Sequence, residues 1–330
     1  MSRLRLSLAI GDYDHVRDLC DGTVTAAGID LIPQRLPVEE VFYRFTRHRE
    51  WDVSEMSLAK YTSLRAAGDE SLSAVPVFPS RAFRHSAIYV RSDRRISEPA
   101  DLAGCRVGVP EWAQTAGVWV RGMLAEDYGL DLASVEWVQA GVNQPGRIEK
   151  VTATLPVGVS VKPMPDRSLS EMLAAGEIDA ALSARAPDVF LAGTAPVRRL
   201  WPNAPAVERE WWARTGVFPI MHILAVRADV LEASPWVARN LLAAFEEAKQ
   251  RSVERLRDIT VARLPLPWTA DRMAEAEAVA GGDPFPYGLE PNRATLERFL
   301  RHAADQGLVP PGSLAVDDLF WPTVHGEVRV

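Results

Sequence analysis

The chain has 330 residues, of which 47% are apolar and 25% are charged, and its formal net charge is −7. These values are typical of a folded globular protein, and the length predicts two domains or one large domain. The negative net charge argues against a nucleic-acid partner, because phosphate binding needs a basic surface.

The first residues predict a strand and not a secretion signal. In the run LRLSLAI, apolar residues alternate with Arg and Ser, and no small-residue cleavage site follows. No stretch approaches the ~20 apolar residues of a membrane span. Cys20 and Cys105 form no CxxC pair, so two free buried thiols are the simplest interpretation. We therefore expect a cytoplasmic protein without a membrane partner.

Strands and helices alternate along the first 92 residues. Apolar periodicity predicts strands over 4–10, 29–36, 51–56, 72–78 and 86–90. Helices are predicted between them, over 15–26, 38–47 and 57–67. This alternation is typical of an α/β layer fold.

A second strand–helix unit begins near residue 93 and ends before a strand that returns to the first unit. Strands are predicted over 105–110, 134–141, 178–183 and 197–203, and the return strand over 216–231. Two helices follow, over 235–256 and 292–308. We therefore expect two lobes, with 1–92 and 213–330 in lobe 1 and 93–212 in lobe 2. Two crossovers would let the lobes close on a ligand in the cleft between them.

Several segments, in the same order along nearly the whole chain, resemble the 4,5-dihydroxyphthalate decarboxylase family. They are WDVSEMSLAKY, PVFPSRAFRHSAIYV, GCRVGVPEW, TAGVWVRG, GRIEKV, TGVFPIMH and GDPFPYGLEPNR. The resemblance implies a two-lobed type II periplasmic-binding-protein-like fold that acts as an enzyme. It also implies loss of CO2 from an aromatic dicarboxylate, with no organic cofactor.

The segment FPSRAFRHSAIYV concentrates cationic side chains in an acidic chain. Arg81 and Arg84 could bind substrate carboxylates through paired hydrogen bonds, since the guanidinium group matches a carboxylate in shape. On a strand the two side chains would point to opposite faces, whereas a turn favoured by Pro79 would let them converge. The alternative is that one arginine pairs with a local Asp or Glu.

Three residues are candidates for proton transfer. His85 lies beside two arginines, which should lower its pKa and keep it neutral near pH 7. His222 lies on the predicted return strand, and a buried structural role is as plausible as a catalytic one for both histidines. Glu55, at the end of a predicted strand, either accepts a phenolic proton or pairs with Arg81.

Four further residues are candidates for substrate binding. Ser57 and Thr115 stand where helices begin, so each is either a helix cap or part of an anion site. Trp112 could stack on an aromatic ring, although most of the ten tryptophans should lie in the core. Arg147 follows a glycine and could line the mouth of the second lobe, or form a solvated loop contact.

The sequence lacks other catalytic signatures. It has no GxSxG elbow, no P-loop, and no HxH, HxxxH or HExxH spacing. A divalent metal held by His15, His85 and His222 is the alternative to a metal-free site. The expected function is decarboxylation of a hydroxylated aromatic carboxylate, and the alternative is a solute-binding or sensor protein. The sequence leaves open whether the protein forms a homo-oligomer.

Overall fold

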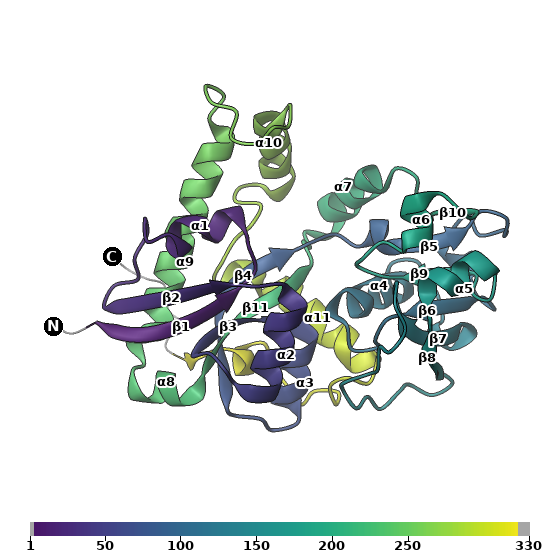
Figure 1. Ribbon diagram of the computed structural model, residues 1–330, viewed down its shortest axis with the longest axis horizontal. Coiled ribbons are helices and arrows are strands. Elements are labelled where there is room, and N and C mark those ends of the chain that lie inside the picture. Colours follow the sequence, from purple (N-terminus) through teal and green to yellow (C-terminus); the bar gives the residue numbers. More distant parts are fainter. Residues whose placement is uncertain (1–2, 323–330) are drawn as a thin grey trace.

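The computed structural model describes residues 3–322 and shows two α/β lobes beside each other (Figure 1). Each lobe is built on its own sheet. The strand order is β2-β1-β3-β11-β4 in the first sheet and β10-β5-β9-β6-β7-β8 in the second. Within the described residues, no helix is both long and apolar enough to cross a membrane.

The first sheet is mixed. Its strands are β1 (Leu4–Ile10), β2 (Ile29–Arg35), β3 (Val53–Ser57), β4 (Leu72–Arg81) and β11 (Ile220–Arg227). The first three pair in parallel, and β11 lies antiparallel between β3 and β4. The predicted return of the chain to the first sheet is therefore confirmed. Because β11 runs in the opposite direction, its first residues lie at the same edge as the last residues of β3.

Helices lie between and after these strands along the chain, and the longest of them packs against the first helix. They are α1 (Asp14–Cys20), α2 (Val38–His48), α3 (Leu58–Ala66), α8 (Ala228–Ala233), α9 (Trp236–Arg257), α10 (Thr269–Ala280) and α11 (Arg293–Asp305). The carboxylate of Asp18 on α1 accepts hydrogen bonds from Arg251 and Arg255 on α9, both at 2.7 Å. Helix α9 therefore packs on the first lobe, whereas α11 packs against α4 (Thr115–Glu126), and α10 projects at the top of Figure 1.

The second sheet is also mixed. Its strands are β5 (Ile88–Arg91), β6 (Arg106–Val109), β7 (Glu136–Gly141), β8 (Val161–Ser168), β9 (Ala180–Leu182) and β10 (Val197–Arg199). The helices of this part of the chain are α4 (Thr115–Glu126), α5 (Leu169–Ala175), α6 (Asp188–Ala192) and α7 (Ala204–Thr215). All four residues of β5 are buried, and the strand pairs with β9 and β10. The first crossover therefore comes before residue 88, earlier than the predicted lobe boundary at 92.

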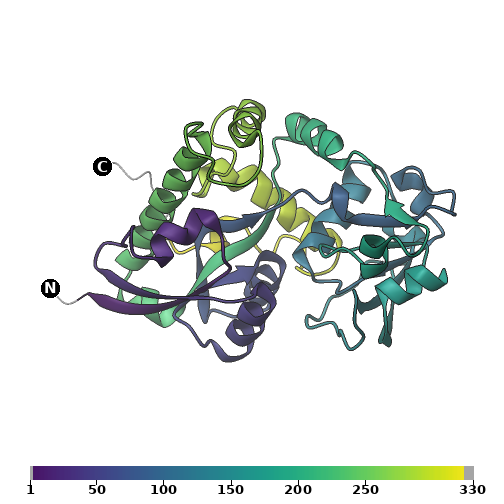
Figure 2. The same cartoon turned by 45° about the horizontal axis from the view of Figure 1, so that its top comes forward.

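Two crossovers join the sheets, at 82–87 and at 200–219, and they touch where they meet the first sheet (Figure 2). The amide of Ala82 donates to the carbonyl of Pro219 at 3.1 Å. The rings of Phe83 and Phe218 stack with their centroids 4.6 Å apart. These contacts tie the two connections into one hinge region.

Strand β4 continues through Pro79 to Arg81, where the sequence favoured a turn. Proline lacks the amide hydrogen that a central strand needs, but β4 is the edge strand of its sheet. The carbonyl of Pro79 lies 3.0 Å from Nε2 of His15. The turn instead follows Arg81, and a short 3₁₀ helix over His85–Ala87 leads into β5.

Candidate active site

Polar groups from three distant parts of the sequence meet at one edge of the first sheet. Gly11 and Tyr13 follow the carboxyl end of β1, and Glu55 lies near the carboxyl end of β3. His222 lies at the start of the antiparallel strand β11 and pairs in register with Ser57. Ligands of open α/β sheets bind beyond such strand ends, so this edge is the natural place for a site.

Glu55 is the centre of this group and is 0% exposed. Its Oε2 accepts a hydrogen bond from the amide of Gly11 at 2.8 Å. Its Oε1 accepts one from the hydroxyl of Tyr13 at 2.5 Å and lies 2.5 Å from Nδ1 of His222. Burial by itself raises the pKa of Glu55, but the charge of His222 and the hydrogen bonds from these three donors lower the pKa overall. Glu55 is therefore ionised.

The ionised state of Glu55 decides which nitrogen of His222 carries a proton. A carboxylate can only accept hydrogen bonds, so Nδ1 of His222 must be the donor in this pair. In the neutral ring, Nε2 then carries a free lone pair. The side chain of His222 is 17% exposed, and the ring of Phe42 meets it edge-on with centroids 4.8 Å apart. The arrangement presents one basic nitrogen, held by a buried carboxylate.

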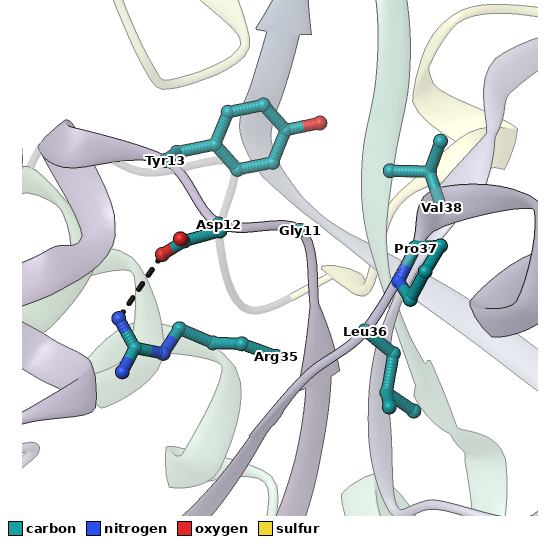
Figure 3. A pocket seen from close by; sticks show the side chains of 7 residues that line it. All are labelled: Gly11, Asp12, Tyr13, Arg35, Leu36, Pro37 and Val38. Atoms are coloured by element: carbon teal, nitrogen blue, oxygen red, sulfur yellow. Dashed lines mark hydrogen bonds and ion pairs between the residues drawn. The ribbon is translucent and has the colours of Figure 1, made fainter.

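A pocket of about 390 Å³ lies beside this group, between the loops that follow β1 and β2 (Figure 3). Its lining residues are Gly11, Asp12, Tyr13, Arg35, Leu36, Pro37 and Val38. Tyr13 lies on one side of it, and Pro37 and Val38 lie on the other. A pocket of this volume holds a small organic molecule. A second pocket, on lobe 2 near Arg106 and Lys162, shares no lining residue with it.

The structure places Arg81 in the hinge region, where it is bonded to the protein itself. Its guanidinium donates to the carbonyls of Phe218 at 3.1 Å and Pro286 at 2.7 Å, and to Oδ1 of Asn292. Burial lowers the pKa of Arg81 to about 9. Arg81 does not pair with Glu55, and its buried Nε has no partner among the described residues.

Arg84 is partly buried, and burial lowers its pKa to about 10. Its Nε lies 3.2 Å from Sδ of Met221, the residue before His222. Among residues 3–322 this is the one hydrogen-bond contact of its side chain, and Arg84 forms no ion pair there. The guanidinium of Arg84 therefore has hydrogen-bond donors that no described residue uses.

Among the described residues, neither His85 nor His15 forms a hydrogen bond to Glu55 or His222, although the ring of His15 lies 5.2 Å from the ring of Tyr13. His85 is 1% exposed and packs against the rings of Tyr128, Trp201 and Trp211, and no residue within 3–322 forms a hydrogen bond to either ring nitrogen. Burial lowers the pKa of both histidines to about 4. In the described part of the chain, no three His, Cys, Asp or Glu side chains are placed to hold a metal, so the three-histidine metal site gains no support.

Ser57 and Thr115 meet across the two halves of the fold. Their hydroxyl oxygens lie 2.8 Å apart, and Oγ1 of Thr115 also accepts the amide of Ala59 at 3.0 Å. Ser57 is the N-cap of α3, and Thr115 is the first residue of α4. The two predicted binding residues are therefore brought together, although each already has a partner within the protein.

Trp112 and Arg147 also have partners within the protein. Trp112 is 2% exposed, its Nε1 donates to the carbonyl of Gln306 at 2.9 Å, and the guanidinium of Arg121 covers its ring at 3.8 Å. The guanidinium of Arg121 therefore closes one face of the Trp112 ring to a substrate. The Nε of Arg147 pairs with Glu111, and its side chain is 37% exposed.

Sequence reasoning missed Tyr13 and Gly11, which complete the hydrogen bonds of Glu55. The available signal was their position, because the run GDYD directly follows the first predicted strand. Polar residues after the carboxyl end of a strand in an α/β sheet are site candidates.

Comparisons with known proteins agree with this geometry at the level of fold and family. The periplasmic aliphatic sulphonate-binding protein SsuA from Escherichia coli matches 98% of this chain and 99% of its own, with a TM-score of 0.54 and 14% identity. The alkanesulfonate-binding SsuA from Xanthomonas axonopodis pv. citri matches 97% and 98%, with a TM-score of 0.51 and 14% identity. The fold is thus type II periplasmic-binding-protein-like.

Two curated relatives carry the same name, while no family model matches the chain. The 4,5-dihydroxyphthalate decarboxylase of Comamonas testosteroni is 43% identical over 309 residues, which are 93% of this chain and 94% of the relative. That of Pseudomonas putida is 46% identical over 213 residues, 64% of this chain and 83% of the relative. The chain belongs to the 4,5-dihydroxyphthalate decarboxylase family.

Proposed function

We propose that this protein is a decarboxylase that releases CO2 from a hydroxylated aromatic dicarboxylate such as 4,5-dihydroxyphthalate. The activity named for both curated relatives supports the reaction class. The observation that carries the proposal is the 2.5 Å contact between Nδ1 of His222 and Oε1 of Glu55, which leaves Nε2 of His222 as a base.

The chemistry needs a place for the electron pair of the breaking carbon–carbon bond. Nε2 of His222 accepts the proton of the hydroxyl para to the departing carboxylate, and the phenolate pushes charge onto the ring carbon that bears this carboxylate. That carbon takes a proton from water. The bond to the carboxylate then breaks, its electrons return to the ring, and CO2 leaves. His222 finally returns its proton to the phenolate oxygen, so each turnover consumes one proton from solvent.

Glu55 serves this reaction through His222. All the hydrogen bonds described for its two oxygens come from Gly11, Tyr13 and His222, and Glu55 is fully buried. It therefore holds the ring of His222 in place and stabilises the positive charge that the ring gains on accepting a proton. In this proposal Glu55 is a positioning residue and not the base that meets the phenol.

We assign the main carboxylate contact to Arg84, because its guanidinium has unused donors and forms no ion pair among the described residues, where Glu208 supplies only a more distant negative charge. Arg147 can add a second contact through its Nη groups, while its Nε pairs with Glu111. Ser57 and Thr115 supply hydroxyls at two helix starts, where an anion is favoured. Arg81, which donates to one acceptor in the hinge region and to two in the C-terminal part of the chain, has a structural role in our scheme.

The test is turnover of 4,5-dihydroxyphthalate by the wild type and by two variants, with CO2 release and substrate affinity measured separately. His222→Asn should lower kcat by about 10²–10⁴-fold, as for loss of a general base, with little change in affinity. Glu55→Gln should lower kcat less. His48→Asn, at an exposed position on α2, is the matched control.

Two results would overturn the proposal. Near-normal turnover by His222→Asn would remove the base from the mechanism. A wild type that binds the dicarboxylate without releasing CO2 would make the protein a binding protein or sensor. In D2O, the product of the active enzyme should carry one deuterium on the ring carbon that lost the carboxylate, and NMR of the product reads this directly.

A further inference from the structure

Tyr13 takes part in two features of the site at once. Its ring is one side of the pocket beside the strand ends, facing Pro37 and Val38 (Figure 3). Its hydroxyl donates to Oε1 of Glu55 at 2.5 Å and lies 3.4 Å from Nδ1 of His222. The same side chain therefore contacts both the space for a ligand and the carboxylate that holds the base.

The hydroxyl of Tyr13 matters because Glu55 has no access to solvent. A buried carboxylate stays ionised only if protein donors replace water, and Glu55 has three of them. When His222 takes up a proton, that proton can stay on the imidazole or move through Nδ1 to Glu55. Each hydrogen-bond donor to the carboxylate of Glu55 favours a proton that stays on the imidazole of His222. Burial and the charge of Glu55 raise the pKa of Tyr13, so its hydroxyl keeps its own proton.

The ring of Tyr13 has a separate role. The pocket has Tyr13 on one side and Pro37 and Val38 on the other, and the charged pair Arg35–Asp12, with 3.0 Å between Nη1 and Oδ1, also lines it. A flat aromatic ring fits between an aromatic and an aliphatic wall and gains contact with both. A flexible aliphatic dicarboxylate would gain much less from the same walls.

We propose that Tyr13 is the residue that couples substrate recognition to the base. Its hydroxyl is a positioning group that keeps the proton on His222 and not on Glu55, and its ring selects an aromatic substrate. This inference rests on the proposed function, since it assigns the pocket to the aromatic ring of the decarboxylase substrate.

Two substitutions at this position separate the two roles. Tyr13→Phe keeps the ring and removes the hydroxyl, so kcat should fall about 10-fold or more while KM changes less than about 2-fold, because one charge-assisted donor is lost. Tyr13→Leu removes both, so KM should rise as well, by about 5-fold or more. Tyr43→Phe, at an exposed tyrosine on α2, should leave both constants unchanged.

A measurement without turnover makes the inference independent of the reaction. In protein with ¹⁵N-labelled histidine, Nδ1 of His222 should be protonated in both charge states of the wild type. In Tyr13→Phe, the protonated pair should show loss of the Nδ1 proton to Glu55. An unchanged Nδ1 signal and unchanged kcat in Tyr13→Phe would overturn the inference while the activity of the wild type stands. A wild type that releases no CO2 would overturn the proposed function instead, and the ¹⁵N result would still decide the role of the hydroxyl.

Discussion

The guanidinium of Arg81 bridges the two connections between the lobes, with 3.1 Å between its Nη1 and the carbonyl oxygen of Phe218. Arg81 ends β4 in the first connection, and Phe218 lies just before β11 in the second. The remaining bonds of Arg81 reach Pro286 and Asn292 in the C-terminal part of the chain. One buried cation therefore fixes three segments that are far apart in sequence.

Arg81→Lys should reduce the free energy of unfolding by about 2–4 kcal/mol, because an ammonium group cannot reach all the acceptors and leaves buried oxygens unpaired. Urea unfolding measures this change. Arg5→Lys, at a position where the side chain is 75% exposed, is the control and should change stability by less than about 0.5 kcal/mol. If Arg81→Lys kept full stability and lost substrate affinity, Arg81 would be a substrate ligand, as the sequence suggested.

Arg84→Met should weaken substrate binding and leave the fold intact. The side chain has no ion pair among the described residues, so its removal exposes no buried carboxylate. Loss of one charge-assisted contact to a carboxylate predicts a rise in KM of about 10-fold or more. Steady-state kinetics and thermal melting together check this prediction. Unchanged KM with a lowered melting temperature would assign Arg84 to packing.

Stability should fall between about pH 6.5 and pH 4, because His15 and His85 resist protonation in the fold. Burial lowers the pKa of each to about 4, whereas a histidine in the unfolded chain takes up its proton near pH 6.5. In this window the unfolded state binds more protons than the native state, so the free energy of unfolding decreases as the pH falls. The limit is about 1.4 kcal/mol per pH unit for each histidine.

His85→Phe tests this directly. A phenyl ring fits the aromatic surroundings of His85 and takes up no proton, so the decline in stability with falling pH should become shallower. Unfolding free energies at pH 6.5, 5.5 and 4.5 give the slope. His48→Asn, at an exposed histidine, should leave the slope as in the wild type. Equal slopes in His85→Phe and the wild type would contradict the prediction.

The ion pair between Glu39 on α2 and Arg185 in the second lobe, 2.6 Å long, should favour the closed arrangement. Both side chains are more than half exposed, so its loss should hardly change stability. Glu39→Gln should raise KM about 2–5-fold, with the difference disappearing at high salt. The neighbouring Glu40→Gln breaks a pair within α2, to Arg44, and is the control. An equal effect of both substitutions would exclude a role in lobe closure.

The amino-acid pattern predicted the elements whose apolar period is regular. The strand over Leu4–Ile10 agrees with prediction at both ends, and the return strand, Ile220–Arg227, lies inside the predicted range 216–231. Prolines caused two errors in the strands. They suggested a turn within β4, and β8, with Pro163 and Pro165, was not predicted because proline is rare in central strands. Both strands are edge strands, and edge position is a property of the sheet and not of the local sequence.

The candidate site could also be predicted only in part from the local sequence. Glu55 and His222 were both named from the sequence, because each lies at a predicted strand end. Their contact across 167 positions follows only from the antiparallel placement of β11 between β3 and β4. The arginine cluster was predicted to bind substrate carboxylates, because a local concentration of cationic residues is visible in the sequence. The acceptors that hold Arg81 are backbone carbonyls and an amide oxygen, which carry no such signal.

Strand β11 begins at Ile220, directly after the second connection ends at Pro219, and His222 is its third residue. The end of the second connection and the residue that carries the proposed base therefore lie on the same short stretch of backbone. A rotation of the lobes that pulls on Pro219 also displaces the imidazole relative to the carboxylate of Glu55. Substrate binding and the alignment of His222 then occur in one movement of the lobes, without a chain of side-chain contacts between them.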